Sequence, residues 1–214
     1  MNSIHFSSVL PEVFAGTPPD KSDIWRQDFR FEQGRTYLLE ADSGRGKSTF
    51  CSYLLGYRCD YSGTITFDET DIRTFKASHW SRIRQSEISC VYQELRLFPE
   101  LTAIENVEIK NSLTKHKSRK QIEDWFEQLD IADKTGVRIA HMSFGQQQRV
   151  ALIRALCQPF HFLLADEPVS HLDERNARAV AEIVSEEVRT QGASLIVTSI
   201  GKQLPVDYDS VIRV

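Results

Sequence analysis

The sequence predicts an α/β fold, in which the strands of a mainly parallel sheet alternate with helices. Three short apolar runs support this prediction: ISCVYQ (residues 88–93), FHFLLADE (160–167) and SLIVTS (194–199). Runs of this kind are typical of strands that are buried on both faces of a sheet. Between them lie longer segments with apolar residues three and four positions apart, which indicates amphipathic helices. The 214 residues are enough for one compact unit.

Strands are also predicted in the first third of the chain. Apolar alternation in DIWRQDFRF (residues 23–31) and the segment TYLLEA (36–41) predict strands on either side of a turn at Gln33 and Gly34. A further short strand pair is predicted around GTITF (63–67). These strands precede the alternating part of the chain.

Four helices follow from the three-to-four spacing of apolar residues. A mainly helical insertion is expected from about residue 94 to residue 157, between two of the predicted sheet strands. The helical segments are KSTFCSYLLG (47–56), SRKQIEDWFEQLD (118–130), GQQQRVALIRALC (145–157) and DERNARAVAEIVSEEVRT (173–190).

Composition excludes several classes of protein. A formal net charge of -4 argues against a general nucleic-acid coat, which usually carries a strong basic excess. The four cysteines are far apart and form no CxxC pair, so neither a zinc site nor a disulfide framework is predicted. The N-terminus lacks the features of a secretory signal, and no window is long and apolar enough to cross a bilayer. A cytoplasmic protein is expected, one that works at a membrane only by docking onto a partner.

A glycine-rich loop, ADSGRGKSTF (residues 41–50), lies between a predicted strand and a predicted helix. In this setting Gly44 and Gly46 allow backbone N–H groups to turn toward a β-phosphate, and the helix N-terminus adds its positive end. Lys47 supplies a charge to the β- and γ-phosphates, and the Ser48 hydroxyl is placed to bind Mg²⁺. The residues predicted to bind ATP in this loop are Ala41, Asp42, Ser43, Gly44, Arg45, Gly46, Lys47, Ser48 and Thr49.

The alternative for this loop is a glycine-rich turn without a ligand, because alanine stands where such phosphate loops usually begin with glycine. A second motif bears on the choice. FLLADEP (residues 162–168) is an apolar strand that ends in two carboxylates. Asp166 can hold the hydration shell of Mg²⁺, and Glu167 can polarise an attacking water. Such a strand end is common by itself, but after a phosphate loop it favours nucleotide chemistry.

HMSFGQQQRVALIRAL (residues 141–156), followed by LLADEPVSHLD (163–173), resembles the ATPase subunit of an ABC transporter. Residues 142–149 stand where the family signature reads LSGGQQQR. Gln93, in VYQELRLFPELTAIENV (91–107), matches the family's Q-loop, and residues 170–173 match its D-loop. The resemblance covers nearly the whole chain. The short length and LADEP are similar to the small cassettes of lipoprotein-release, macrolide-efflux and cell-division complexes.

The resemblance implies a P-loop NTPase (RecA-like) core with an N-terminal antiparallel β subdomain and a helical insertion subdomain. The chain is then one ATPase domain over residues 1–214, with its nucleotide-binding core at 1–93 and 158–214 and its helical subdomain at 94–157. Ser143 and Gly145 of the signature lie at the start of a predicted helix, whose positive end would meet a partner's γ-phosphate.

The resemblance also implies how such a subunit works. Two cassettes, as a homodimer or a heterodimer, close head to tail around ATP, and hydrolysis lets them part and moves transmembrane permease subunits. ATP and Mg²⁺ are the implied cofactors, no nucleic acid is expected, and the subunit lies on the cytoplasmic face of the membrane. The implied residues are Ser143, Phe144, Gly145 and Gln146 for the partner's ATP, Ser48, Gln93 and Asp166 for the metal, and Glu167, Gln93 and Ser199 for catalysis.

Three residues depart from the family pattern. Ala41 replaces a glycine of the phosphate loop, and Phe144 replaces a glycine of the signature, so that its side chain must point away from the phosphate. Ser199 stands where the family usually has a histidine, and its hydroxyl is too short to reach both phosphate and water without a bridging water. We therefore expect Mg-ATP binding with slow hydrolysis. The alternatives are a degenerate cassette that binds ATP for assembly, and an ABC-type ATPase outside transport.

Further residues are candidates for contacts at the edges of this site. In the family an aromatic residue near the N-terminus stacks on adenine, and Phe14 is the candidate, with Trp25 as the alternative. His171 is either a dimer contact or a solvated histidine. The basic run at residues 115–120 is either a contact with acidic lipid or a partner, or a solvated helix start, and the solvated helix start is the favoured interpretation. The membrane partner is expected on the helical part, near Leu97, Phe98 and Leu101.

Overall fold

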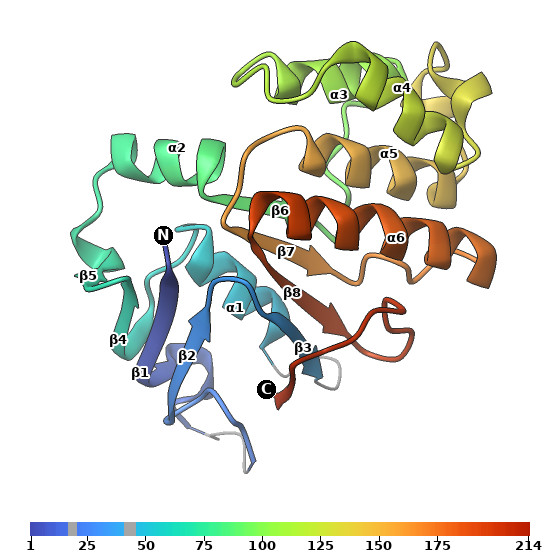
Figure 1. The fold of residues 1–214 in the computed structure, drawn as a ribbon. Helices are drawn as coiled ribbons and strands as arrows, with labels where there is room; N and C mark the ends of the chain where they lie inside the picture. The colour runs from blue at the N-terminus through green and yellow to red at the C-terminus, as the bar shows by residue number, and fades with distance from the viewer. Residues whose placement is uncertain (17–20, 41–45) are drawn as a thin grey trace.

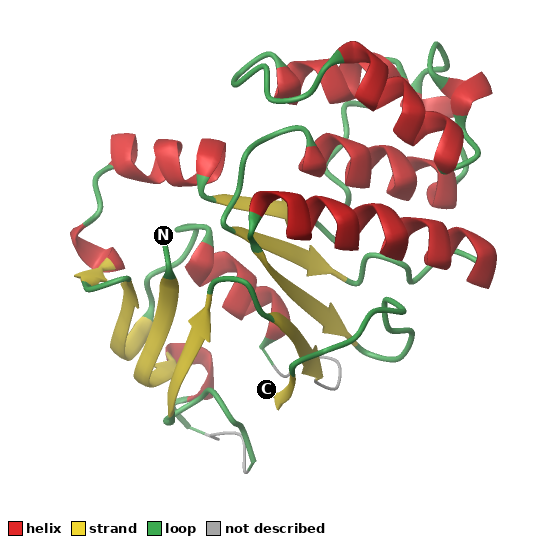
Figure 2. Ribbon diagram, viewed as in Figure 1, coloured by secondary structure: helices red, strands yellow, loops and turns green. Residues whose placement is uncertain are grey.

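The structure is a computed structural model that describes residues 1–16, 21–40 and 46–214. Among these residues the strands form two sheets, which lie in different parts of the molecule (Figure 1). One is four-stranded with the order β2-β1-β4-β5, and the other is five-stranded with the order β6-β7-β8-β3-β9. Figure 2 shows that helices build the end of the molecule beyond the five-stranded sheet.

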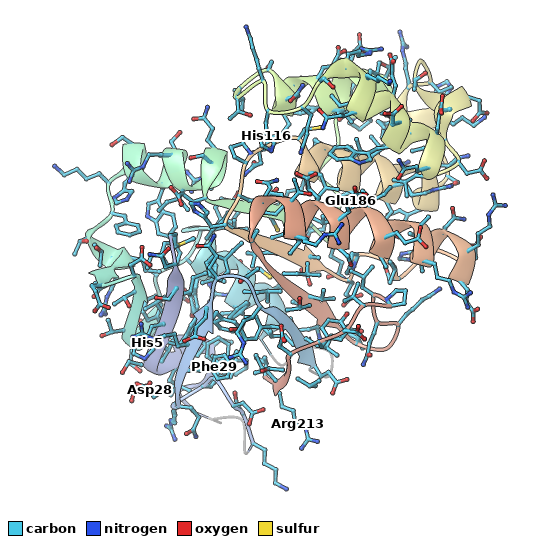
Figure 3. The ribbon with its side chains drawn as sticks, viewed as in Figure 1. His5, Asp28, Phe29, His116, Glu186 and Arg213 are labelled. Carbon is cyan, nitrogen blue, oxygen red and sulfur yellow. The ribbon has the colours of Figure 1, made fainter. Side chains whose placement is uncertain are left out.

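The four-stranded sheet is antiparallel and comes mainly from the first third of the chain. Its strands β1 and β2 bring His5 and Asp28 together, with 2.8 Å between the histidine Nε2 and the carboxylate (Figure 3). This hydrogen bond lowers the pKa of Asp28. The bounds of its strands are β1 Ser3–Pro11, β2 Asp28–Glu32, β4 Tyr61–Phe67 and β5 Thr70–Asp71.

The five-stranded sheet is parallel throughout its described pairs. Successive side chains of a strand point to opposite faces, and so the neighbours Leu163 and Leu164 enter different hydrophobic cores. Both faces are covered, which is why the strands read as continuous apolar runs. Its strands are β6 Ile88–Val91, β7 Phe162–Asp166, β8 Ser194–Ser199, β3 Thr36–Glu40 and β9 Ser210–Arg213.

Helices cover the two faces of the parallel sheet. Helix α1 lies between the two sheets and contributes Phe50 and Tyr53 to one core, whereas α5 and α6 cover the other face (Figure 1). Helices α3 and α4 pack on α5 and extend the second core away from the sheet. The helices are α1 Lys47–Leu54, α2 Ala77–Ser86, α3 Ala103–Asn111, α4 Arg119–Gln128, α5 Phe144–Leu156 and α6 Glu174–Gln191.

A buried ion pair joins the helical end to the rest of the molecule. Lys117, which precedes α4, is 8% exposed and pairs with Glu187 of α6. His116 lies beside the pair, 3.9 Å from the Glu187 carboxylate, and burial lowers the pKa of His116. The prediction that residues 115–120 are a solvated helix start is therefore wrong for Lys117. A charged side chain is buried there because its partner, 70 positions along the chain, is buried with it.

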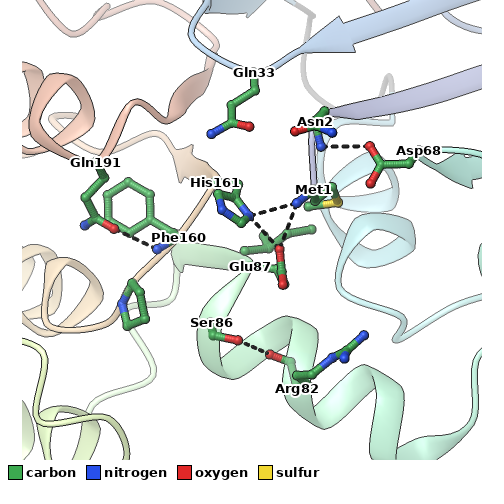
Figure 4. Close-up of polar contacts among 12 residues, drawn as sticks. Met1, Asn2, Gln33, Asp68, Arg82, Ser86, Glu87, Phe160, His161 and Gln191 are labelled. Carbon is green, nitrogen blue, oxygen red and sulfur yellow. Dashed lines mark hydrogen bonds and ion pairs between the residues drawn. The ribbon is translucent and has the colours of Figure 1, made fainter.

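The amino ends of β6 and β7 are tied to the start of the chain (Figure 4). The Met1 ammonium group lies 3.2 Å from the Glu87 carboxylate and 3.0 Å from His161 Nδ1. Burial raises the pKa of Glu87, but the hydrogen bonds from His161 and Met1 outweigh it and lower that pKa. This charged cluster stabilises the side of the sheet where β6 and β7 begin, which is opposite to the side where β7 ends at Asp166.

Most predicted elements are confirmed. The three apolar runs form β6, β7 and β8, and the four helical segments form α1, α4, α5 and α6. The turn after β2 is present, with Gly34 at φ 82°, a conformation that glycine adopts without strain. The strand predicted at residues 23–31 is wrong for 23–27, and β2 and β3 belong to different sheets.

Candidate nucleotide-binding site

The candidate site lies at the carboxyl edge of the parallel sheet. Register places Glu40, the last residue of β3, opposite Ser199 of β8, and Asp166 of β7 opposite Thr198. The carboxyl ends of the parallel strands β3, β6, β7 and β8 therefore lie at the same edge of the sheet. In open α/β sheets this edge is where ligands bind.

The phosphate loop is described from its last glycine onward. Gly46 has φ 107° and precedes α1, whose first residue is Lys47, 6% exposed. Ser48 is exposed in the first turn, and the Thr49 hydroxyl accepts a hydrogen bond of 3.3 Å from Arg58. The first N–H groups of a helix have no partners within the helix, so this end suits an anion. The predicted residues Ala41, Asp42, Ser43, Gly44 and Arg45 lie outside the described residues.

Asp166 is a buried carboxylate at the end of β7, 8% exposed. Burial raises its pKa, whereas a hydrogen bond from the Thr198 hydroxyl and the charge of Lys47 act in the opposite direction. A carboxylate that burial has stripped of water gains from a nearby cation. Oxygen donors from Asp166, Ser48 and Gln93 are the kind that Mg²⁺ prefers, so the chemistry of this donor set fits the ion.

Glu167 follows Asp166 in a left-handed conformation, with φ 50°. Its N–H donates to the Thr198 carbonyl at 3.1 Å, and its own carbonyl accepts from the Ser170 N–H at 3.3 Å and from Gln148 Nε2 at 3.0 Å. Such a conformation costs on the order of 1–3 kcal/mol in a residue other than glycine and persists where the surroundings hold it. The backbone of this candidate catalytic residue is therefore fixed from two sides.

Gln93 and Ser199 lie at the carboxyl ends of β6 and β8, the two strands that flank β7, and they differ in exposure. Gln93 is exposed in the turn after β6. Ser199 is 4% exposed, and its hydroxyl donates to the Lys202 carbonyl at 3.1 Å and accepts from the Gly201 N–H at 3.2 Å. The Ser199 hydroxyl thus holds its own turn, and its role in catalysis stays a prediction.

Two aromatic residues lie against the described end of the phosphate loop. A Cβ at Gly46 would meet the Phe14 ring at 3.0 Å and the Trp25 Nε1 at 3.1 Å. Trp25 is 3% exposed and packs at an angle on Phe6 and Tyr53 in the core. Only Phe14 of these two is half-buried, so it keeps the exposed surface that stacking on adenine requires.

The signature residues form the start of α5. Ser143 caps the helix, accepting from the Gln146 N–H at 3.4 Å, and the Gln146 side chain accepts from the Ser143 N–H at 2.9 Å. Phe144 is 43% exposed, and its ring packs on His171 with 4.4 Å between ring centroids. A Cβ at Gly145 would lie 3.1 Å from the His171 carbonyl. Phe144 thus rests on the D-loop of its own chain.

Gln148 is a residue of the site that the sequence reasoning missed. It is 3% exposed on α5, and besides the Glu167 carbonyl it contacts Ser170 and His171. A glutamine inside a helical segment carries no signal for such a role, because its partners are 19 or more positions away.

Membrane-spanning character is absent from the part of the chain that the structure describes: none of its helices is both long and apolar enough to cross a bilayer.

Comparison with known proteins identifies the family. The ABC transporter family model matches residues 26–170. An uncharacterized ABC transporter ATP-binding protein of Mycobacterium tuberculosis is 33% identical over 176 residues, which are 81% of this chain and 53% of that protein. The lipoprotein-releasing system ATP-binding protein LolD 1 of Chlorobium chlorochromatii is 34% identical over 172 residues, 78% of this chain and 70% of that protein. The chain spans about half the length of its mycobacterial relatives, 53%.

The fold agrees with the family that the sequence comparisons identify. The dimeric structure of MJ0796, a bacterial ABC transporter cassette, superposes with a TM-score of 0.78 at 23% sequence identity, over 92% of this chain and 87% of that one. The same cassette in a post-hydrolysis dimer bound to ADP and Pi gives a TM-score of 0.77 at 22% identity, with the same coverage. Sequence and fold together therefore show that the chain belongs to the ABC transporter family, as an ATP-binding cassette of the P-loop NTPase fold.

Proposed function

We propose that the chain is the ATP-binding and ATP-hydrolysing subunit of an ABC transporter, which couples the closing of two cassettes on ATP to movement of membrane subunits. The observation that carries the proposal is the meeting of Lys47, at the positive end of α1, with the buried Asp166 at one sheet edge. We further propose that residues 1–93 and 158–214 act as the nucleotide-binding core and residues 94–157 as the helical subdomain.

The proposed reaction uses residues at this edge. The α1 N-terminus and Lys47 bind the β- and γ-phosphates, while Ser48, Asp166 and Gln93 would hold Mg²⁺, which neutralises phosphate charge when bound. Glu167 accepts a proton from water, whose oxygen bonds to the γ-phosphorus as the bond to the bridging oxygen breaks, giving ADP and phosphate. Phe14 supports the adenine ring by stacking.

Hydrolysis is proposed to be slow. Ser199, at the end of β8, stands where the family usually has a histidine. Its hydroxyl is already hydrogen-bonded to the Lys202 carbonyl and the Gly201 N–H of the turn that follows. No residue at this position then orients water directly. A degenerate cassette that binds ATP without hydrolysing it is the second candidate, and this same observation favours it.

ATP is proposed to bind between two cassettes arranged head to tail, either two copies of this chain or this chain and a close relative. The capped start of α5 supplies N–H groups for the partner's γ-phosphate, and Ser143 and Gln146 fix its geometry. The position of the Phe144 ring is compatible with this assignment. The ring packs on His171 of its own chain, so this bulky side chain need not crowd the partner's phosphate.

Calorimetric titration with ATP and Mg²⁺ tests the proposal. We expect saturable binding to the purified chain, dependent on Mg²⁺, together with slow release of phosphate. Absence of any heat of ATP binding with Mg²⁺ present would contradict both candidate functions.

We also propose a docking surface for the membrane subunit. A cavity of about 300 Å³ lies between α2, α3 and the segment after β6. Of the three residues expected at the contact, Phe98 lines this cavity and is 50% exposed, whereas Leu97 packs on the core and Leu101 is half-buried. The cavity is also lined by four cations, Arg84, Arg96, Lys110 and Arg154, and by Tyr57 and Tyr92. This combination fits a membrane-subunit segment that carries a carboxylate among apolar side chains, and it would hold the chain at the cytoplasmic face of the membrane.

Reversing the charge at one position of this cavity with Lys110→Glu is expected to weaken the attachment of the chain to its membrane subunits, because a like charge would face the partner's carboxylate. The measurement is co-purification from detergent-solubilised membranes, with polytopic membrane proteins identified by mass spectrometry. Lys120→Glu, at an exposed position of α4, is the control and should still co-purify. Equal recovery of membrane subunits with Lys110→Glu and the unchanged chain would rule out this surface.

A further inference from the structure

Gln148 connects the signature helix to the candidate catalytic residue of its own chain. Its amide nitrogen donates to the Glu167 carbonyl at 3.0 Å and to the Ser170 hydroxyl at 3.4 Å. Its amide oxygen accepts from the His171 N–H at 3.4 Å. A side chain must offer both donors and an acceptor to make this set of bonds, and a neutral amide does so.

The first turn of α5 adds a second contact with the same segment. The Phe144 ring packs edge to face on His171, and the Ser170 hydroxyl lies 2.9 Å from the His171 Nδ1. Gly145 permits this approach, since a Cβ there would lie 3.1 Å from the His171 carbonyl. The start of α5 and residues 170–171 are thus packed together at two levels, one turn of helix apart.

Glu167 needs support of this kind. Its left-handed backbone, with φ 50°, is maintained by the two hydrogen bonds that its carbonyl accepts, one of which comes from Gln148. Loss of that bond would leave the carbonyl of the half-buried Glu167 with one hydrogen bond fewer and free the backbone to relax. A shift of about 1 Å in a catalytic group is enough to reduce a rate about 10²-fold.

We propose that Gln148 is a positioning residue for Glu167, through which the placement of the signature helix sets the placement of the catalytic carboxylate. Closure of a partner's ATP against the start of α5 then acts on hydrolysis at this chain's own ATP. The inference rests on the proposed function, because it assumes that Glu167 takes the proton from water. Phe144 and His171 form the second contact of the same connection.

The test is the variant Gln148→Leu, which keeps the approximate volume and removes every polar contact. We expect kcat for ATP to fall by about ten-fold or more, while KM and the Kd for ATP stay within about two-fold, because Gln148 lies one turn beyond the start of α5 that is proposed to meet the partner's ATP. Gln158→Leu is the matched control. Gln158 is 1% exposed, and its amide donates to the Ile88 carbonyl at 3.2 Å, at the other edge of the sheet. Gln158→Leu should lower the melting temperature without changing kcat.

A second variant separates positioning from a loss of packing. Gln148→Glu keeps the shape but presents a carboxylate oxygen to the Glu167 carbonyl when it is ionised. Protonation restores a donor, so the ratio of its kcat to that of the unchanged chain is expected to rise as pH falls. Gln158→Glu should show no such recovery.

The outcomes distinguish this inference from the function beneath it. Slow turnover that requires Lys47, together with the kcat loss and the pH-dependent recovery, supports the inference. The same turnover with kcat unchanged in Gln148→Leu, or with kcat and ATP affinity lost in parallel, overturns the inference alone. An unchanged chain that shows no Lys47-dependent turnover overturns hydrolysis as the function, and the inference with it.

Discussion

Replacing Glu167 with glutamine is expected to slow ATP turnover by about 10²- to 10⁴-fold and to leave ATP binding intact. Glutamine has nearly the same shape as glutamate but cannot accept a proton from water. Its backbone can keep the bonds to Thr198 and Gln148 that hold this position, since both involve main-chain atoms of residue 167. The variant therefore removes the chemistry and preserves the support.

Phosphate release and calorimetry on the same preparations measure this effect. Glu174→Gln, in the exposed first turn of α6, is the control, because Glu174 makes only a surface pair with Arg178. Turnover that is equal in the unchanged chain and in Glu167→Gln would contradict the proposed base. Binding without such a difference would favour the degenerate cassette.

Replacing Lys47 with alanine is expected to weaken ATP binding by at least about thirty-fold in Kd. Truncation of a charged side chain in a buried ionic contact costs about 2–5 kcal/mol, which is at least about a thirty-fold weaker Kd. Lys47 is 6% exposed and lies near Asp166, whose pKa is raised by burial and is lowered in part by the charge of Lys47. The substitution thus removes the proposed phosphate ligand and leaves the buried Asp166 carboxylate without that charge.

Titration calorimetry with Mg-ATP gives the affinity, and thermal unfolding without nucleotide shows whether the fold persists. Lys76→Ala, at the exposed start of α2, serves as the control and should bind normally. If Lys47→Ala bound Mg-ATP as tightly as the unchanged chain, the loop after β3 would not be the nucleotide site.

The fold was predictable where the chain itself carries periodic signals. Buried strands such as β7 and β8 show as apolar runs, and α4 and α6 show as amphipathic helices. Helix α2 was not predicted, and of its residues only Ile83 is buried. Helix α3 and the short strand β9 were not predicted individually either. Which sheet a strand joins depends on partners far along the chain, and so β2 and β3 could not be separated.

The residues of the site were likewise predictable only where local motifs contain them. Asp166, Glu167 and Lys47 lie in local motifs, and the structure brings their elements to one edge. The engagement of the Ser199 hydroxyl with Lys202 and the burial of Lys117 against Glu187 depend on side-chain contacts that spacing does not encode. Gln148 was missed for this reason.

Helix α5 is a continuous helix that carries three functional contacts along its length. Its 13 residues extend about 20 Å. Ser143 caps its start, and Gln148, one turn further along, donates a hydrogen bond to the Glu167 carbonyl. Arg154, in its last turn, donates hydrogen bonds of 2.6 Å to the carbonyls of Leu95 and Arg96. A tilt of about 5° about its centre would shift the two ends in opposite directions by about 1 Å. A displacement at the proposed docking surface for the membrane subunit would therefore reach the other end of α5, because the helix is continuous between them.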